Sequence, residues 1–410
     1  MVLEPNTSGL DVNAAHAQLT FRCLCEQAPD DAWRRVIAHG WPGWREWFTS
    51  RGGNDLPITE AHRALRRFMP EFEPLVEELN QAANPDESLQ RFLTFWCPPR
   101  YLVNCSQAVI VDDKGPFLIR NYDLDPALNE ATLLTTSWRG TRVMGMVEAM
   151  AGLADGMNEH GLTASLTFGG RINVGKGFGI PLIMRYLLQM CRDTQDAVDL
   201  LRAVPAHMSY NITLIDASGD WSTVMVAPDR PTMVRQQPWA TNHQLGVEWP
   251  RHGRISNTLG RAQHLERLLE DTAANACTLH QTFRQKPVFS TNYRQGFGTV
   301  YTAAYRPLQR EVQLSWSDGT TVVRTMDQVG SHKQPIAYFD SGSRAPATPT
   351  YTPPAWHPDW YDAFVKATHP AHSGPEQVRL AAFWRRNHFG QDHDWWNLLP
   401  NTTDILQEDS

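Results

Sequence analysis

The stretch NCSQAVIVDDKGPFLIRNYD, residues 104–123, decides the fold because the hydrophobic period changes there from helical to extended. The runs that begin at Ala108 and Phe117 contain the β-branched and aromatic residues that strands prefer. Asp112-Asp-Lys-Gly lies between them and is typical of a turn. We therefore predict a β-hairpin whose second strand returns beside the start of the first, next to Cys105.

The chain before this hairpin has a helical pattern. Over residues 13–95, apolar residues recur three and four positions apart, which is the period of an amphipathic helix. Thr59 and Asp86 precede such runs and are candidate N-caps. The sequence therefore predicts a helical leader.

The chain after the hairpin alternates between strand and helix patterns. Further strands are expected at 161–168, 210–216, 223–226, 299–305 and 312–316, and amphipathic helices at 182–204 and 259–271. Strands in runs that are separate from helices in runs favour an α+β fold. We divide the chain into a leader (1–104), a catalytic domain (105–342) and a proline-rich connector with a Trp- and His-rich tail packed on the body (343–410).

Composition excludes several classes of protein. The 410 residues are 41% apolar and 20% charged, with a net charge of −7 and no long basic run, which argues against nucleic-acid binding. No run of about 18 apolar residues suggests a membrane span, and the N-terminus lacks a secretory signal pattern. Six scattered cysteines without a CxxC pair argue against a disulfide framework. These features predict a cytoplasmic protein.

Cys105 lies at the junction of leader and hairpin, and its neighbours suggest chemistry. The hairpin would bring Arg120 and Asp123 back to Cys105, where a cation favours the thiolate. If Cys105 became a chain terminus, its α-amino group, with a pKa of about 7.7–8.0, would be a base for its own thiol. The alternatives are a buried structural thiol and a surface Arg120–Asp123 ion pair.

Four motifs resemble one known family. They are Asn104-Cys-Ser-Gln-Ala-Val, Ile119-Arg-Asn-Tyr-Asp, Gly156-Met-Asn-Glu-His-Gly-Leu-Thr-Ala-Ser-Leu-Thr-Phe-Gly and Ala240-Thr-Asn-His. In this order the chain resembles the acyl-coenzyme A:6-aminopenicillanate acyltransferase family and, more distantly, choloylglycine hydrolases and penicillin V acylases. The resemblance runs from about residue 68 to 327. It implies an N-terminal-nucleophile fold, a four-layer αββα sandwich of two antiparallel sheets, and self-cleavage between Asn104 and Cys105.

The resemblance also implies roles for particular residues. Cys105 would be the nucleophile, Arg120 would lie near its sulfur, and Asp123 would hold its freed amine. Asn242 would donate its side-chain amide to the oxyanion. Two secondary candidates are Thr167, as a second oxyanion donor through its backbone N–H, and Arg261, for which the alternative is a solvated helix residue.

Asn104 departs from the pattern, because the acyltransferase that typifies the family has glycine there. Asparagine tolerates unusual backbone conformations better than most residues, so cleavage is still expected. Asn158 is interpreted as a turn residue. The histidines of the tail lack the spacing of a metal site, so no metal and no cofactor are expected. They are His357, His369, His372, His388 and His393.

These features predict a self-processing cysteine enzyme that cleaves a linear, non-peptide amide through an acyl-enzyme at Cys105. One alternative is acyl transfer to an amine, with a coenzyme A thioester or an amide as donor. A second is an uncleaved, non-catalytic acyl-amide-binding protein, and a third is a thiol enzyme with His243 as base. A small-molecule acyl amide is the expected partner, with associated fragments, homo-oligomers allowed, and neither nucleic acid nor membrane.

Overall fold

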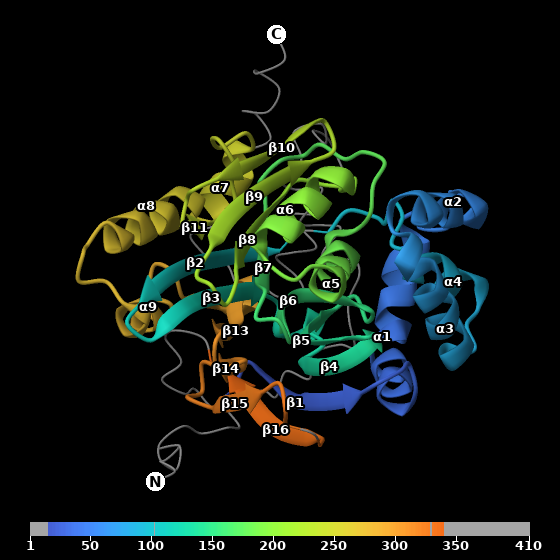
Figure 1. The fold of residues 1–410 in the computed structure, drawn as a ribbon, viewed down its shortest axis with the longest axis horizontal. Helices are drawn as coiled ribbons and strands as arrows, with labels where there is room; N and C mark the ends of the chain where they lie inside the picture. The colour runs from blue at the N-terminus through green and yellow to red at the C-terminus, as the bar shows by residue number, and fades with distance from the viewer. Residues whose placement is uncertain (1–14, 102, 329, 340–410) are drawn as a thin grey trace.

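The computed structural model describes residues 15–101, 103–328 and 330–339 (Figure 1). In this part of the chain, nine strands form one sheet in the order β10-β9-β8-β7-β6-β5-β4-β1-β16. Its strands are β1 (Ala17–Glu26), β4 (Thr132–Arg139), β5 (Thr141–Glu148), β6 (Gly152–Asn158), β7 (Thr163–Phe168), β8 (Tyr210–Ile215), β9 (Trp221–Ala227), β10 (Arg230–Arg235) and β16 (His332–Tyr338). Neighbouring strands are antiparallel except β1 and β4, which run parallel.

The second described sheet contains the hairpin predicted around Cys105. Its strand order is β11-β2-β3-β13-β14-β15, with β12 paired to β13, and every pair is antiparallel. The strands are β2 (Asn104–Asp112), β3 (Gly115–Leu124), β11 (Trp239–Ala240), β12 (Thr291–Asn292), β13 (Phe297–Arg306), β14 (Glu311–Ser315) and β15 (Thr321–Thr325). The sequence therefore located the central hairpin of this sheet correctly.

Helices cover the outer faces of the two sheets (Figure 1). The first sheet carries α5 (Ile180–Met190) and α6 (Thr194–Ala203), and the second carries α8 (Thr258–Leu269) and α9 (Ala276–Thr282), with α7 (Pro250–Ile255) packed on α8. The sheets contact each other through β2, β3, β7 and β8. The predicted α+β class and four-layer αββα sandwich are confirmed.

The leader helices form a group of their own at one side of the molecule (Figure 1). They are α1 (Asp31–Ser50), α2 (Ile58–Phe68), α3 (Glu73–Ala83) and α4 (Glu87–Leu93), with the 3-10 helix η2 (Pro70–Phe72) before α3. Two further 3-10 helices in the described chain are η3 (Pro126–Leu128) and η4 (Tyr293–Gln295). Aromatic contacts join the leader to the body: the Trp33 and Trp138 rings are 5.8 Å apart, and those of Phe72 and Tyr186 are 4.8 Å apart.

Two features of the elements differ from the sequence-based expectations. The helical pattern over residues 13–95 is wrong at its start, because β1 is a strand bonded to β4 and β16. The helix expected over 182–204 is two helices, α5 and α6, separated by Cys191–Asp193, where Asp193 caps α6 through the Asp196 N–H. The connector and tail expected over 343–410, with their histidines and tryptophans, lie outside the described residues.

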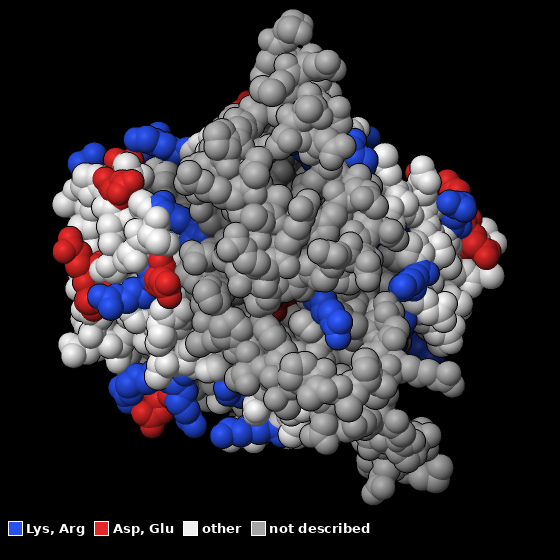
Figure 2. Space-filling model, turned by 180° about the vertical axis from the view of Figure 1, so that it is seen from behind, with Lys and Arg blue, Asp and Glu red and all other residues white. Residues whose placement is uncertain are grey.

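The surface agrees with a protein of mixed charge. Figure 2 shows the face opposite to that of Figure 1, where basic and acidic side chains lie interspersed among the described residues. None of the described helices has both the length and the apolar character needed to cross a bilayer.

Candidate active site

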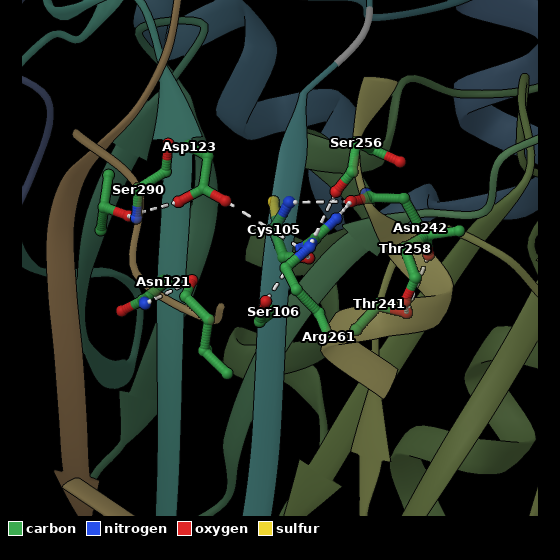
Figure 3. A network of polar contacts seen from close by, with 12 residues as sticks. Cys105, Ser106, Asn121, Asp123, Thr241, Asn242, Ser256, Thr258, Arg261 and Ser290 are labelled. Atoms are coloured by element: carbon green, nitrogen blue, oxygen red, sulfur yellow. Dashed lines mark hydrogen bonds and ion pairs between the residues drawn. The ribbon is translucent and has the colours of Figure 1, made fainter. Parts of the chain in front are cut away.

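Cys105 lies near the beginning of β2, beside the end of β3 (Figure 3). The antiparallel register pairs Cys105 with Tyr122 and Asn104 with Asp123. Directly opposed residues of such a ladder share a face of the sheet, and the next pair points to the other face. Cys105 therefore points toward the space between the sheets, while Asp123 points toward the helices α8 and α9. The predicted return of β3 to Cys105 is confirmed.

Arg120 is the cation beside the sulfur. Its Nη2 lies 3.2 Å from Cys105 Sγ, and its Nε donates to the Leu166 carbonyl at 3.1 Å. Nη1 donates to Asp155 at 2.5 Å, and the whole guanidinium is buried. The alternative of a surface Arg120–Asp123 ion pair is wrong, because both residues are buried and the carboxylate partner of Arg120 is Asp155.

Asn242 reaches Cys105 from the loop that follows β11. β11 pairs with Gln107 and Ala108 of β2, so the chain beyond it runs alongside Cys105. Asn242 Oδ1 accepts from the Cys105 backbone N–H at 3.2 Å. Its Nδ2 donates to the carbonyls of Val103 (3.3 Å) and Phe168 (3.2 Å). Asn242 Nδ2 therefore donates to the carbonyl one residue before that of Asn104. The peptide bond between Asn104 and Cys105 is the one expected to be cut.

Arg261, on α8, organises this corner of the site (Figure 3). Its Nη2 donates to Asn242 Oδ1 at 2.6 Å, and its Nη1 donates to Cys105 O at 2.5 Å and Ser106 Oγ at 2.8 Å. Only 3% of Arg261 is exposed, so the alternative of a solvated helix residue is wrong. One guanidinium thus fixes both the backbone at Cys105 and the orientation of the Asn242 amide.

Asp123 lies on the helix side of the same corner. Its Oδ1 accepts from the Thr299 hydroxyl at 2.7 Å, and its Oδ2 is 4.0 Å from Arg261 Nη1. Burial raises the pKa of Asp123 to about 6, against the opposing effects of Arg261 and Thr299. Asp123 opposes Asn104 across the ladder, which is where a carboxylate could meet a freed amine of Cys105.

The remaining candidates have supporting contacts. Thr167 is buried, and its hydroxyl donates to the Thr241 carbonyl at 3.0 Å, so it holds the loop that carries Asn242. Its backbone N–H as an oxyanion donor remains a prediction.

His243 Nδ1 lies 2.9 Å from the Thr258 hydroxyl, and burial lowers the pKa of this histidine. Asn158 ends strand β6 at the predicted turn, and its side-chain oxygen accepts from the His160 and Leu162 N–H groups of that turn.

Burial acts against ionisation of the Cys105 thiol in the intact chain. Burial raises the pKa of Cys105 to about 11; Arg120 opposes this shift and Asp123 adds to it. Cys105 is fully buried. Two cavities, of about 520 and 350 Å³, are lined by other parts of the described chain, the first at β10, β11 and α8 and the second at α1, β1 and β16. The sulfur of Cys105 is therefore not exposed to solvent in this arrangement of the chain.

Two site features carried no signal strong enough to be found in the sequence. Asp155 lies in the run Gly152–Asn158 without any motif of its own, and it meets Arg120 only through the contact between sheets. Gly170 has a positive φ of 68°, and a Cβ there would overlap the carbonyl oxygen of Asn242. The Gly169-Gly pair signals a loop, but only the fold shows which residue the glycine lies against.

Comparison with solved structures finds similar chains at low sequence identity. Among solved structures, an arginine-to-leucine variant of conjugated bile acid hydrolase from Clostridium perfringens is 11% identical, with a TM-score of 0.38 over 59% of this chain and 100% of that one. Penicillin V acylase from Agrobacterium tumefaciens is 14% identical (TM-score 0.34; 52% and 83%). The Caenorhabditis elegans N-acylethanolamine-hydrolyzing acid amidase orthologue is 15% identical (TM-score 0.36; 50% and 93%). No curated protein matches the sequence significantly.

The family model gives the assignment. The model described as acyl-coenzyme A:6-aminopenicillanic acid acyl-transferase matches residues 111–320, just over half of the chain. The matched segment contains Arg120, Asp123, Asn242 and Arg261, and it begins six residues after Cys105. The chain therefore belongs to the acyl-coenzyme A:6-aminopenicillanic acid acyl-transferase family.

Proposed function

We propose that the chain is a self-processing cysteine enzyme that cleaves a linear, non-peptide amide, with Cys105 as nucleophile. The observation that carries this proposal is the position of Cys105 at the head of β2. There its sulfur lies 3.2 Å from Arg120 Nη2 and its backbone nitrogen 3.2 Å from Asn242 Oδ1. A cut before Cys105 would turn that nitrogen into a free amine within the same constellation.

The first step is cleavage of the peptide bond between Asn104 and Cys105. Sγ attacks the Asn104 carbonyl carbon, the C–N bond to Cys105 breaks, and a thioester forms while the amine takes up a proton. Water then hydrolyses the thioester, leaving a carboxylate on Asn104 and a free α-amine on Cys105. Because the Asn242 amide already donates to the adjacent Val103 carbonyl, it lies close to the oxyanion of this step.

Turnover would then use the freed amine as base. An α-amine has a pKa of about 7.7–8.0, so near neutral pH it can accept the thiol proton. The thiolate attacks the substrate carbonyl, Asn242 donates to the oxyanion, and the protonated amine gives its proton to the leaving amine. Departure of Val103 would free the Asn242 amide for this role. Water, or an amine in the transfer alternative, resolves the acyl-thioester.

Acyl transfer is the second candidate, because the matching family model describes an acyl-transferase. Hydrolysis needs no second binding site, since water is always present, and we therefore place it first. Substrate identity, cytoplasmic location and homo-oligomers remain predictions. The uncleaved binding protein is the alternative favoured by the high pKa of the buried thiol in the intact chain.

The proposal is tested by amine release from a panel of linear N-acyl amides, combined with peptide mass spectrometry of the acylated protein. We expect turnover by the unaltered protein, an acyl group on the Cys105 peptide, and neither in Cys105→Ala. Cys277→Ala is the matched control, since Cys277 is exposed on α9. Full turnover by Cys105→Ala would contradict the proposal. Added amine acceptors that capture the acyl group would favour transfer.

A further inference from the structure

Asp155 is a fully buried carboxylate that the mechanism above does not use. It lies on β6 and accepts three short hydrogen bonds, from Arg120 Nη1 (2.5 Å), the Tyr301 hydroxyl (2.7 Å) and the Tyr305 hydroxyl (2.5 Å). All of these side chains are buried. A carboxylate in such a place is stable as an anion only because it is paired and hydrogen-bonded.

The guanidinium of Arg120 is shared between this carboxylate and the nucleophile. Nη1 faces Asp155, while Nη2 faces Cys105 Sγ at 3.2 Å. Nε is fixed on the Leu166 carbonyl, and the Tyr122 ring lies 4.4 Å from the guanidinium carbon. The arginine is therefore held in place by contacts other than Asp155, and it presents separate N–H groups to an anion on one side and to sulfur on the other.

We infer that Asp155 sets the acidity of Cys105 as the counter-ion of Arg120, so that it is a tuning residue of the nucleophile. A cation beside sulfur favours the thiolate, and a carboxylate on the same cation cancels part of that effect. In a buried site this cancellation is strong, because little water screens it. The inference rests on the proposed role of Cys105 as nucleophile.

The two tyrosine hydroxyls weaken this cancellation by stabilising the charge of Asp155. Tyr301 accepts from Arg120 at 2.9 Å as well as donating to Asp155, so its removal would change both groups. Tyr305 donates to Asp155 Oδ1, whereas Arg120 donates to the other oxygen of that carboxylate, Oδ2. Without this hydroxyl, the negative charge of Asp155 would be less stabilised and would offset more of the positive charge of Arg120. The Cys105 thiol would then be less acidic.

Other charged and titratable groups face these two residues, and the test leaves them in place. Asp123 and Tyr122 on β3, Arg261 on α8 and Tyr210 on β8 lie within electrostatic reach of Cys105. Glu148 on β5 lies within electrostatic reach of Asp155. Since all of these stay unchanged, a shift in the Cys105 titration between variants reports the altered residue.

The direct test is a titration of Cys105 in Asp155→Asn. Thiolate is followed by its ultraviolet absorbance, as the difference between each protein and the same protein carrying Cys105→Ala. We expect the acid dissociation constant of Cys105 to rise about tenfold or more, because a buried negative charge is gone while Arg120 keeps its position. An unchanged or smaller constant would overturn the inference.

Asp216→Asn is the matched control. Asp216 is also a buried aspartate, but it holds the Thr194 and Ser218 N–H groups and has no contact with Arg120 or Cys105. The control should leave the Cys105 titration unchanged. A shift as large as that of Asp155→Asn would show a general effect of losing a buried carboxylate, and would also overturn the inference.

Tyr305→Phe gives a result in the opposite direction and decides the question if Asp155→Asn does not fold, since Arg120 would lose its carboxylate partner. We expect the acid dissociation constant of Cys105 to fall roughly two- to threefold. Tyr338→Phe is its control, because the Tyr338 hydroxyl is also buried but donates to the Val300 carbonyl. A rise or no change in Tyr305→Phe would contradict the inference.

The titration does not depend on turnover. If Cys105→Ala still hydrolysed amides while the variants shifted the Cys105 titration as expected, the proposed function alone would fail. If Cys105→Ala were inactive but the variants left the titration unchanged, only the role of Asp155 would fail.

Discussion

The side-chain amide of Asn242 is occupied in the intact chain, with Nδ2 on the Val103 and Phe168 carbonyls and Oδ1 held by Arg261. This orientation presents the donor, not the oxygen, to the carbonyl groups around the cut. We expect Asn242→Ala to lose at least about 100-fold in amide turnover, since one oxyanion donor contributes that much. Steady-state kinetics with circular dichroism will show it; a folded variant with near-normal turnover removes Asn242 from the site.

Gly170 permits the close approach of its loop to Asn242. Its φ of 68° disfavours a side chain, and a Cβ would overlap the Asn242 carbonyl oxygen. Gly170→Ala should therefore displace Asn242 and lower turnover by about tenfold or more, as small misplacements of catalytic groups do. Gly246→Ala is the control, because a Cβ there has open space around it. Equal turnover of the two variants would show that the approach at Gly170 has no catalytic consequence.

At the scale of elements, the leader helix α4 is fixed at its N-terminus by Asp86, whose Oδ1 accepts from the Leu89 N–H at 2.8 Å. We expect Asp86→Ala to lower the free energy of unfolding by about 1 kcal/mol, the usual contribution of an N-cap. Denaturant unfolding in a Cys105→Ala background keeps the chain in one piece. Glu87→Ala, at an exposed position, should change stability by only a few tenths of a kcal/mol; a loss equal to that of Asp86→Ala would show that the cap contributes nothing of its own.

Local chemistry made some elements predictable and left others hidden. The β2–β3 hairpin and the Asp86 cap could be read directly, because turn residues and capping side chains act within a few positions. Thr59 was wrong as a cap, since α2 already begins at Ile58. β1 was read as helix because its pairing partners, β4 and β16, lie more than 100 and 300 residues away. Pairing at such distances overrides local periodicity.

In the site too, contacts within one hairpin could be predicted, and contacts between distant elements could not. Cys105, Arg120 and Asp123 could be placed together because one hairpin carries them all. The burial of Arg261 and its hydrogen bond to Asn242 come from the packing of α8 on β2. The pairing of Arg120 with Asp155 comes from the contact between the two sheets. No sequence spacing reports either contact.

The whole molecule contains a buried carboxyl pair beneath the leader. Glu130 Oε1 accepts from Trp44 of α1 and from the Met150 N–H, while its Oε2 has no hydrogen-bond partner among the described residues, so no donor there stabilises a negative charge. Burial, with a smaller effect of Glu148, raises the pKa of Glu130 to about 8, and burial raises that of Glu148 to about 7. The folded state therefore binds these protons more tightly than the unfolded state.

Stability from this pair is fully present below a pH of about 4.5 and is lost as the pH rises through about 7 to 8. Glu130→Gln keeps the shape of the side chain, with an NH2 group in place of the protonated oxygen. The unfolding free energy of the variant should therefore fall less between pH 5 and 9 than that of the unaltered chain, and the two decreases should differ by on the order of 2–4 kcal/mol. Thermal unfolding across this range measures it. An identical pH dependence in the two proteins would mean that Glu130 is ionised throughout.

The leader is also part of the fold as a whole. β1 lies between β4 and β16 in the larger sheet, so the leader could leave only by breaking two strand pairings. We expect the fragments of a cut chain to stay together in native solution and to separate only when denatured.

The measurement that tests the central claim most directly is therefore the intact mass under denaturing conditions, with N-terminal sequencing. We predict two fragments, the second beginning at Cys105, and a single uncut chain for Cys105→Ala. One chain of 46.4 kDa for the unaltered protein as well would contradict the account, because Cys105 would then have no free amine to act as its base.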